Sequence, residues 1–539
     1  MTASAPELIG ILVACGAAAA ALVLEDRRAR QVAIAVALVA APVLVAGNVW
    51  DEPRVVDFRT SAPQVGVAVV FAAAAVTVLC WFFRRYPQAF PIAAVAVLPL
   101  RAPLEIGGET ANLLVPLYAV IAAGAIVSVL RPAPARRVPA GDPWPRRLRW
   151  LLAATPVLYA IQASYSVDVS NAIENIGFFL VPFAILFCLL AEVEWTRQLL
   201  RRTLLAVGAV TVGCALVGIA QYLVGELFFN PELGDANELH VYFRVNSIFF
   251  DPNIFGRYLA LALTAFAACI AWGGERRDLW AAAAVFAVGL VALAFSYSLT
   301  SFAALLAGLG MVCLLRWRWR GVAGFAALGA VALVALVVAG GTPTSDIEDV
   351  RSIDSGHTDL ARGGLILFGV IGPDAPPADQ DVGKPIAGYG SGSFGRAFFE
   401  HIEQARTTVS HSEPVTVAAE QGVIGLTLYV ALLVVSLVCL LGSGAAHSLA
   451  RAAVAACFVA LLVASFGYTG FAIDPAMWAL LALGIALRPG PPGASANIGG
   501  TSRLNDAGSR GGRRRAPPPR CWGVVGPGAA PARPPPPRP

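Results

Sequence analysis

The chain has 539 residues, of which 57% are hydrophobic and 14% are charged, and its mean hydropathy is +0.70. A soluble domain carries about 25% charged residues, so this composition excludes an ordinary cytosolic protein. The net charge of +5 comes mostly from arginines in short loops and in the C-terminal tail, so we expect no nucleic-acid partner.

Long apolar segments recur along the chain and predict an all-α, polytopic transmembrane helical bundle, because a helix satisfies its own backbone groups inside a bilayer. We expect about 12–15 spans, since a span needs about 20 apolar residues and several candidates are short. The weakest are 88–104, 300–315 and 473–487. The others are 8–24, 31–50, 65–83, 112–130, 150–166, 172–191, 203–223, 253–272, 279–297, 321–340, 416–441 and 450–468.

The arginines predict how the chain crosses the membrane. They gather in alternate loops, at 25–30, 84–88, 131–149, 195–202, 273–278 and 316–320. The positive-inside rule places these loops in the cytoplasm, so the loops at 51–64, 225–252 and 341–415 face outward. The organisation is then a helical region (1–340), one long exoplasmic loop (341–415), C-terminal helices (416–488) and a cytoplasmic tail (489–539). The tail is rich in Pro, Gly and Arg and is expected to be disordered.

The first candidate site lies in "FRVNSIFFDPNIFGRYLALAL" (243–263). Asp251 is placed to cap a helix whose first residue is Pro252. Capping accounts for Asp251 but not for two nearby cations, Arg244 and Arg257. Arg257 falls between one and two turns into an apolar span, where a charge is costly and usually functional unless it snorkels to the surface.

Two further clusters lie in and after the long loop. Gly388, Gly390 and Gly392 in "AGYGSGSF" allow a tight loop whose backbone N–H groups can meet an anion, although a flexible turn has the same composition. "GRAFFEHIEQAR" (395–406) predicts a short amphipathic helix. His411 stands just before a span, with Glu413 and Glu420 nearby, and "EQGVIG" has the small residues that let helices pack closely.

The order of these clusters resembles the O-antigen ligase and polymerase superfamily of polytopic bacterial glycosyltransferases. The resemblance covers roughly 90–470 and rests on "RVNSIFFDPN", "GYGSGSF" and "HSEPVTVAAEQGVIG". Family members often have an arginine before the long loop, where this chain reads "SYSLTSF" (296–302), and Asn in place of Ser412. Arg101 is another outward arginine and would supply the missing charge.

The resemblance implies a membrane glycosyltransferase that moves a glycan from a polyprenyl-diphosphate carrier to an acceptor hydroxyl, outside the bacterial cytoplasmic membrane. Arginine binds phosphate in a bidentate manner and is always charged, so Arg244, with Arg257 and Arg101, would hold the diphosphate. His411 would act as the general base, and direct displacement would invert the anomeric carbon. Gly388, Gly390, Gly392 and Glu420 are expected to bind substrate.

The acceptor stays open between glycan, lipid and protein, and so does the choice between ligase and polymerase. The expected partners are the lipid-linked donor, the acceptor and membrane lipid. We expect no metal and no cofactor, because no outward cluster of carboxylates and histidines has ligand spacing.

Two other classes remain. A transferase that uses a polyprenyl-monophosphate sugar would need an acidic pair in an early outward loop, where Asp51 and Glu52 stand. A transporter or flippase would need ionisable residues or broken helices near the midplane.

Overall fold

The computed structural model describes residues 3–50, 56, 62–106, 109–131, 142–229, 243–338, 359–371, 382–402, 410–442 and 444–488. All of them belong to the compact unit Met1–Pro489. The predicted tail (489–539) and much of the predicted long loop lie outside the described residues.

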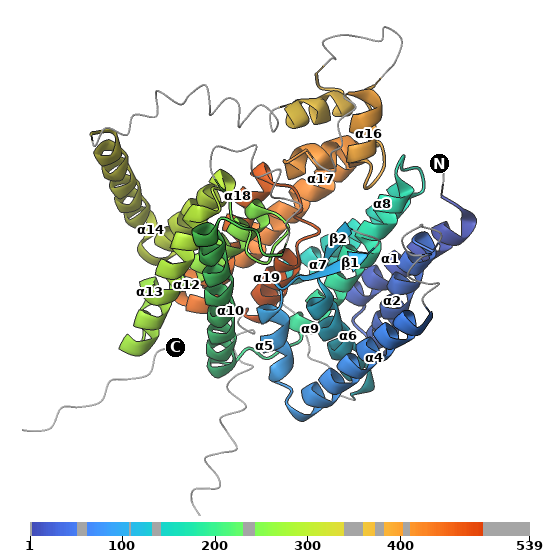
Figure 1. Ribbon diagram of the computed structural model, residues 1–539, viewed down its shortest axis with the longest axis horizontal. Helices are drawn as coiled ribbons and strands as arrows, with labels where there is room; N and C mark the ends of the chain where they lie inside the picture. Colours follow the sequence, from blue (N-terminus) through green and yellow to red (C-terminus); the bar gives the residue numbers. More distant parts are fainter. Residues whose placement is uncertain are drawn as a thin grey trace, which may run out of the picture. The chain divides into compact units, whose positions relative to one another are not determined.

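The prediction of an all-α polytopic fold is confirmed. In the described part of the chain, nine helices are long and apolar enough to cross a membrane, as expected of a multi-pass membrane protein. Figure 1 shows the helices in sequence colours. The first half has α1 (Ala5–Val23), α2 (Arg27–Asn48), α4 (Ala62–Arg85), α5 (Ala89–Ala96), α6 (Val115–Leu130), α7 (Pro143–Ala163), α8 (Val169–Glu174), the π-helix η1 (Asn175–Leu180), α9 (Val181–Ala191) and α10 (Arg197–Val224).

The second half has α12 (Pro252–Trp272), α13 (Arg276–Phe295), α14 (Leu299–Val338), α16 (Phe394–His401), α17 (Glu413–Leu441), the 3₁₀ turn η2 (Ala445–His447), α18 (Leu449–Gly467) and α19 (Pro475–Ala486). Residues 359–368 are also helical. Helix α14 joins the two predicted spans 300–315 and 321–340, with non-helical backbone at Arg318 between them. The predicted amphipathic helix is present as α16, which buries Phe394, Ala397 and Phe398.

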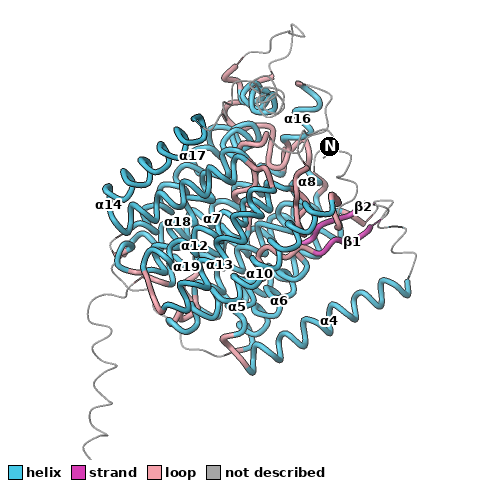
Figure 2. Tube along the Cα trace, turned by 60° about the vertical axis from the view of Figure 1, so that its left-hand side comes forward, coloured by secondary structure: helices cyan, strands magenta, loops and turns pink. Residues whose placement is uncertain are grey.

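The predicted span 88–104 is helical only in α5. Pro99 and Pro103 follow α5, and proline cannot continue a helix. The chain instead forms an antiparallel hairpin of β1 (Ala102–Ile106) and β2 (Glu109–Leu113), in which Ala102 pairs with Leu113 and Ile106 with Glu109. Figure 2 shows this hairpin in magenta. The hairpin therefore replaces the last part of this predicted span and the start of the next one.

The arginine-rich loops meet at one end of the helices, which we call the arginine-rich end. Arginines from one loop bind groups of another, so the alternation predicted from the sequence is present in space. The contacts are Arg27 Nη2 to Arg131 O (3.1 Å), Arg131 to Arg84 O, Arg30 to Glu192 (2.5 Å), Arg202 to Gln88 (2.9 Å), Arg201 to Asp278 (2.8 Å) and Arg488 to Asp142 (2.8 Å).

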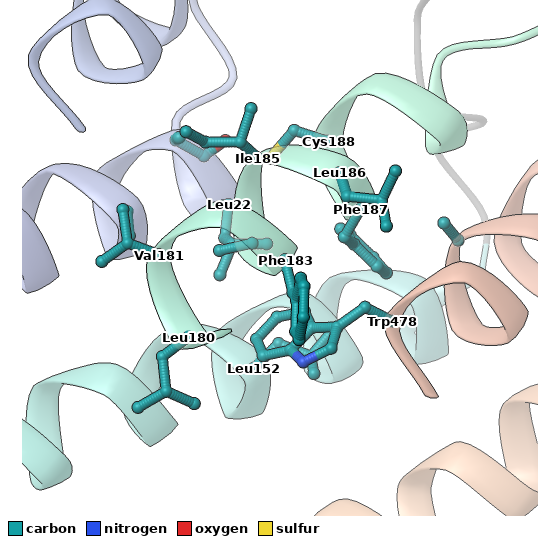
Figure 3. Close-up of a cluster of buried hydrophobic side chains, with 14 of the residues drawn as sticks. Leu22, Leu152, Leu180, Val181, Phe183, Ile185, Leu186, Phe187, Cys188 and Trp478 are labelled. Atoms are coloured by element: carbon teal, nitrogen blue, oxygen red, sulfur yellow. The ribbon is translucent and has the colours of Figure 1, made fainter. Parts of the chain in front are cut away.

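Trp478 fixes α19 in the core. Figure 3 shows its indole among Leu152, Phe183 and Phe187, which come from α7 and α9. The Trp478 ring is fully buried and lies edge-on to Phe187, with ring centroids 6.5 Å apart. The indole Nε1 donates to Ala472 O at 2.9 Å, so the residue that anchors α19 also holds the segment just before it.

Helix α17 is broken at Gly422, whose φ of 65° and ψ of −162° are not helical. The Glu413 carboxylate accepts the N–H of Gly470 at 2.7 Å, and the Tyr429 ring lies edge-on to Phe471 at 5.8 Å. In a straight helix, Glu413 and Tyr429 would be about 24 Å apart. Both contact the same short segment and Gly422 is non-helical, so α17 bends at Gly422 and its first half (413–421) leaves the axis of the second half.

Residues 382–394, which we call the wedge, satisfy the backbone that this break exposes. The Val423 N–H donates to Pro385 O at 2.8 Å, and the Gly390 N–H donates to Glu420 O at 2.8 Å. The wedge also contacts α7 and α8 through Tyr165 Oη to Ala387 O (2.9 Å), Ser166 Oγ to Ser391 O (2.9 Å) and Asn171 Nδ2 to Gly392 O (2.6 Å).

We predict that Gly422→Ala destabilises the protein by about 1–3 kcal/mol or more, because φ is positive at this position. A Cβ atom there would also lie 2.3 Å from Ile386 O. The thermal midpoint of the purified protein, followed by size-exclusion chromatography, measures the change.

Gly213→Ala is the matched control. It lies inside α10, and a Cβ atom there meets nothing within 4 Å. Alanine in a helix is favoured over glycine by about 0.5–1 kcal/mol, so stability should be unchanged or slightly higher. Equal midpoints for Gly422→Ala and wild type would contradict the break.

Candidate active site

Helix α19 is too short to cross the hydrocarbon core and begins inside the bundle. Helix α19 has 12 residues and covers about 18 Å, whereas the hydrocarbon core is about 30 Å thick. Its C-terminal side is at the arginine-rich end, where Arg488 pairs with Asp142. The start of α19 therefore lies inside the bundle. We call the region around it the recess and define it by Arg101, Arg257, His411, Tyr468 and Asp474.

Arg257 and Asp474 form a buried ion pair at the centre of the recess. Nη2 of Arg257 lies 3.2 Å from Oδ2 of Asp474, and their side chains are 8% and 13% exposed. Asp474 also caps α19 by accepting the Ala476 N–H at 2.8 Å. Arg257 thus does not snorkel to the surface. Its Nη1 is buried and has no hydrogen-bond partner among the described residues, so it can receive a ligand.

Arg101 brings a second guanidinium to the recess. It follows α5, which ends at Ala96, and precedes β1. It interacts electrostatically with both Asp474 and Arg257. Its Nε is also buried and lacks a hydrogen-bond partner in the described part of the chain. Arg257 pairs with Asp474 and Arg101 lies near both, so two guanidinium groups are held close together, as anion binding requires.

Tyr468 links His411 to the arginines. The His411 ring centroid lies 5.8 Å from that of Tyr468, and the Arg257 guanidinium lies 5.6 Å from the same ring. His411 has a φ of 59°, an uncommon conformation for a residue other than glycine and one that is enriched at functional sites. Tyr468 also interacts electrostatically with Asp251, which connects the recess to the start of α12.

Arg244 lies beside Asp251 at the edge of this group. Its Nε donates to Ser296 O at 3.2 Å and its Nη2 to Asn253 Oδ1 at 3.1 Å, so it joins the start of α12 to the end of α13. Burial lowers the pKa of the Arg244 guanidinium, and the nearby Asp251 carboxylate opposes this shift. The cap predicted at Asp251 is present, because its side chain accepts the Asn253 N–H at 2.6 Å.

The starts of three helices also meet here, and the amino terminus of a helix carries positive potential. Asp251 caps α12 and Asp474 caps α19, but Ser412 makes no side-chain cap at the start of α17. The start of α17 is thus a helix N-terminus without a side-chain cap, and its positive potential adds to that of the two arginines. Together they form a site suited to an anion.

The glycine cluster and Glu420 bind each other. The Glu420 carboxylate is buried and accepts the N–H groups of Gly392 (2.9 Å) and Phe394 (3.1 Å). Gly388, Gly390 and Gly392 all have positive φ, and each lies against the backbone of another segment. The loop does meet an anion, as its composition suggests, but that anion is the chain's own carboxylate. This geometry favours a positioning role for the three glycines over contact with substrate.

The sequence interpretation missed Tyr468 and Asp474. Both lie in "GYTGFAID" (467–474), whose glycines and polar residues interrupt two apolar segments, and that interruption was the available signal. Asp51 and Glu52, the pair of the monophosphate alternative, lie outside the described residues. Among the residues that the structure does describe, no three or more His, Cys, Asp or Glu are grouped so that they could hold a metal ion.

No model of a known protein family matches this chain, and no curated protein matches it significantly.

We predict that Glu420→Ala loosens the wedge. Loss of this carboxylate leaves two buried N–H groups without an acceptor, which costs about 1–3 kcal/mol and corresponds to about 5- to 150-fold faster local amide exchange. Hydrogen exchange followed by mass spectrometry over residues 388–401 measures this. Glu400→Ala is the control, because Glu400 pairs with Arg396 on the exposed side of α16. Unchanged exchange in Glu420→Ala would refute the anchoring role.

Proposed function

We propose that this chain is a membrane glycosyltransferase that moves a glycan from a polyprenyl-diphosphate carrier to an acceptor hydroxyl. The observation that carries the proposal is the convergence of Arg101, Arg257 and His411 in one recess, although they lie far apart in the sequence. Two of them present buried guanidinium nitrogens without partners among the described residues. A diphosphate is the anion that paired guanidinium groups bind best.

In this proposal Arg101 and Arg257 bind the diphosphate, and Arg244 adds positive charge at the edge. The acceptor hydroxyl oxygen attacks the anomeric carbon as the bond from that carbon to the diphosphate oxygen breaks. His411 takes the hydroxyl proton, and the arginines stabilise the charge that grows on the leaving diphosphate. Attack from the face opposite the leaving group inverts the anomeric carbon. The acceptor can be a glycan, a lipid or a protein, so both ligase and polymerase fit.

Transport is the second candidate, because many secondary transporters have broken helices such as α17. The first half of α17 carries Glu413 and Glu420, and both are buried. Each carboxylate is, however, bound by backbone N–H groups of the chain, which favours a structural role. Movement of a solute by the protein in vesicles, without any glycan product, would favour this candidate.

Deletion of the gene tests the proposed function. Loss of a polymerase should reduce the surface glycans to single repeats, and loss of a ligase should leave full chains on the lipid carrier. Complementation with Arg101→Ala or His411→Ala should fail. Arg201→Ala should restore the glycans, because Arg201 is exposed and pairs with Asp278 at the arginine-rich end. Unchanged glycans in the deletion strain would refute the proposal.

Purified protein separates the two roles. Arg101→Ala should weaken donor binding about 10- to 150-fold, since a hydrogen bond to a charged group contributes about 1.5–3 kcal/mol. Arg101→Lys should recover it in part. His411→Ala should bind donor normally and transfer about 10²- to 10⁴-fold more slowly. A wild-type transfer rate in His411→Ala would remove the histidine from the mechanism.

We further propose that the protein lies in a bacterial cytoplasmic membrane with the arginine-rich end inside and the recess open outward. In a background without the nine native cysteines, a membrane-impermeant maleimide should label Glu226→Cys in intact cells and spare Gly274→Cys. Both should react after permeabilisation. Labelling of Gly274→Cys alone in intact cells would reverse the orientation.

A further inference from the structure

A second compartment adjoins the recess. It is a cavity of about 250 Å³ between α7, the α8–η1 segment, both halves of α17 and the segment 469–473. We call it the acidic cavity, because Glu413 and Glu420 both line it. Gly470 separates it from the recess, since a Cβ atom on Gly470 would lie 3.8 Å from Arg257 Nη1.

The lining of the acidic cavity suits hydroxyl groups. Two asparagines, Asn171 and Asn175, face it from one side of the α8–η1 segment, and Thr155 and Tyr159 face it from α7. Carboxylates and amide oxygens accept hydrogen bonds from hydroxyls, and amide N–H groups donate to them. No Arg, Lys or His is among the described residues of the lining. A phosphate would thus meet two carboxylates and no cation.

One buried polar side chain of the cavity has no hydrogen-bond partner within the described structure. The Tyr429 hydroxyl is buried and has no partner of hydrogen-bond geometry, and the adjacent Ser465 hydroxyl donates to Leu462 O instead. The half-buried Gln421 side chain lines the same cavity. A buried polar group without a partner is unfavourable, so a polar ligand would stabilise the Tyr429 hydroxyl.

We infer that the acidic cavity binds one neutral sugar unit, and that in the proposed transfer reaction this unit belongs to the acceptor. The inference of an acceptor rests on the proposed function. The volume of the acidic cavity is just below the range of about 300–1,000 Å³ that is usual for pockets of drug-sized ligands. It equals the volume of about eight water molecules, which fits a single sugar ring. Its wall is shared with the recess through Glu413 and Gly470, and His411 precedes Glu413 by two residues. An acceptor sugar held here would lie on the Glu413 side of Gly470, and the arginines that would hold the donor lie on the other side.

Sugar binding to the full chain in lipid nanodiscs tests the inference without any donor. Saturation-transfer NMR with free hexoses, deoxyhexoses and N-acetylhexosamines should detect at least one that binds at millimolar concentration. Gln421→Leu should weaken that sugar about three- to tenfold, the effect of one lost hydrogen bond. Leu428→Trp should abolish binding by filling the cavity. Gln88→Leu is the matched control, because Gln88 binds Arg202 at the arginine-rich end, and it should bind sugar as wild type does.

Several outcomes would overturn the assignment. The first is that folded wild type binds no sugar. The second is that Gln421→Leu, Leu428→Trp and wild type bind sugar equally well. The third is that a sodium ion, in place of a sugar, stabilises the protein through Glu413 and Glu420.

The experiments can refute the proposed function and the sugar site independently of each other. Arg101→Ala should lose transfer and keep sugar binding. Binding without transfer from any lipid diphosphate would refute the transferase alone, and transfer without sugar binding would refute the cavity alone. Competition of the bound sugar with the lipid donor, rather than with the acceptor, would refute the acceptor assignment.

Discussion

The structure depends on how it satisfies backbone groups where helices stop inside an apolar bundle. Water is absent there, so every exposed N–H and C=O needs a partner from the protein. Three carboxylates meet this need. Glu413 accepts the N–H groups of residues 470–472, Glu420 accepts two from the wedge, and Asp474 caps α19. Without these three carboxylates, the N–H groups of the wedge, of residues 470–472 and of the start of α19 would lose their acceptors.

The same interruptions divide the interior by charge. On one side of Gly470, Arg101 and Arg257 lie beside the Asp474 carboxylate. On the other side, Glu413 and Glu420 face amides and hydroxyls. A thin wall of backbone separates the two, because a glycine at position 470 adds no side chain. An anion and a neutral polar group can thus lie a few ångströms apart without competing for the same partners.

The sequence predicted features whose causes are local. Asp251 and Pro252 start α12, because a side-chain cap and the fixed φ of proline both act within one helical turn. The spacing of apolar residues in α16 likewise shows which face of that helix is buried. The sequence did not predict the break at Gly422, because "EQGVIG" is a normal apolar helix by composition. That break requires Pro385 and Ile386, which are 36 or more residues away in the chain. For the same reason the partner of the glycine loop could not be foreseen. Buried Asp474 was overlooked because its ion-pair partner, Arg257, belongs to another helix.

The contacts of the wedge impose an order on biosynthesis. Residues 385–392 touch α7 and α8, which the ribosome completes first, but their other partners are residues 419–423 of α17. Until α17 has been made, the N–H groups of Gly390, Gly392 and Phe394 lack their acceptors in Glu420. The wedge can therefore take its final place only after the first half of α17 has been synthesised. The turn that carries the three glycines is thus among the last parts of the bundle to form.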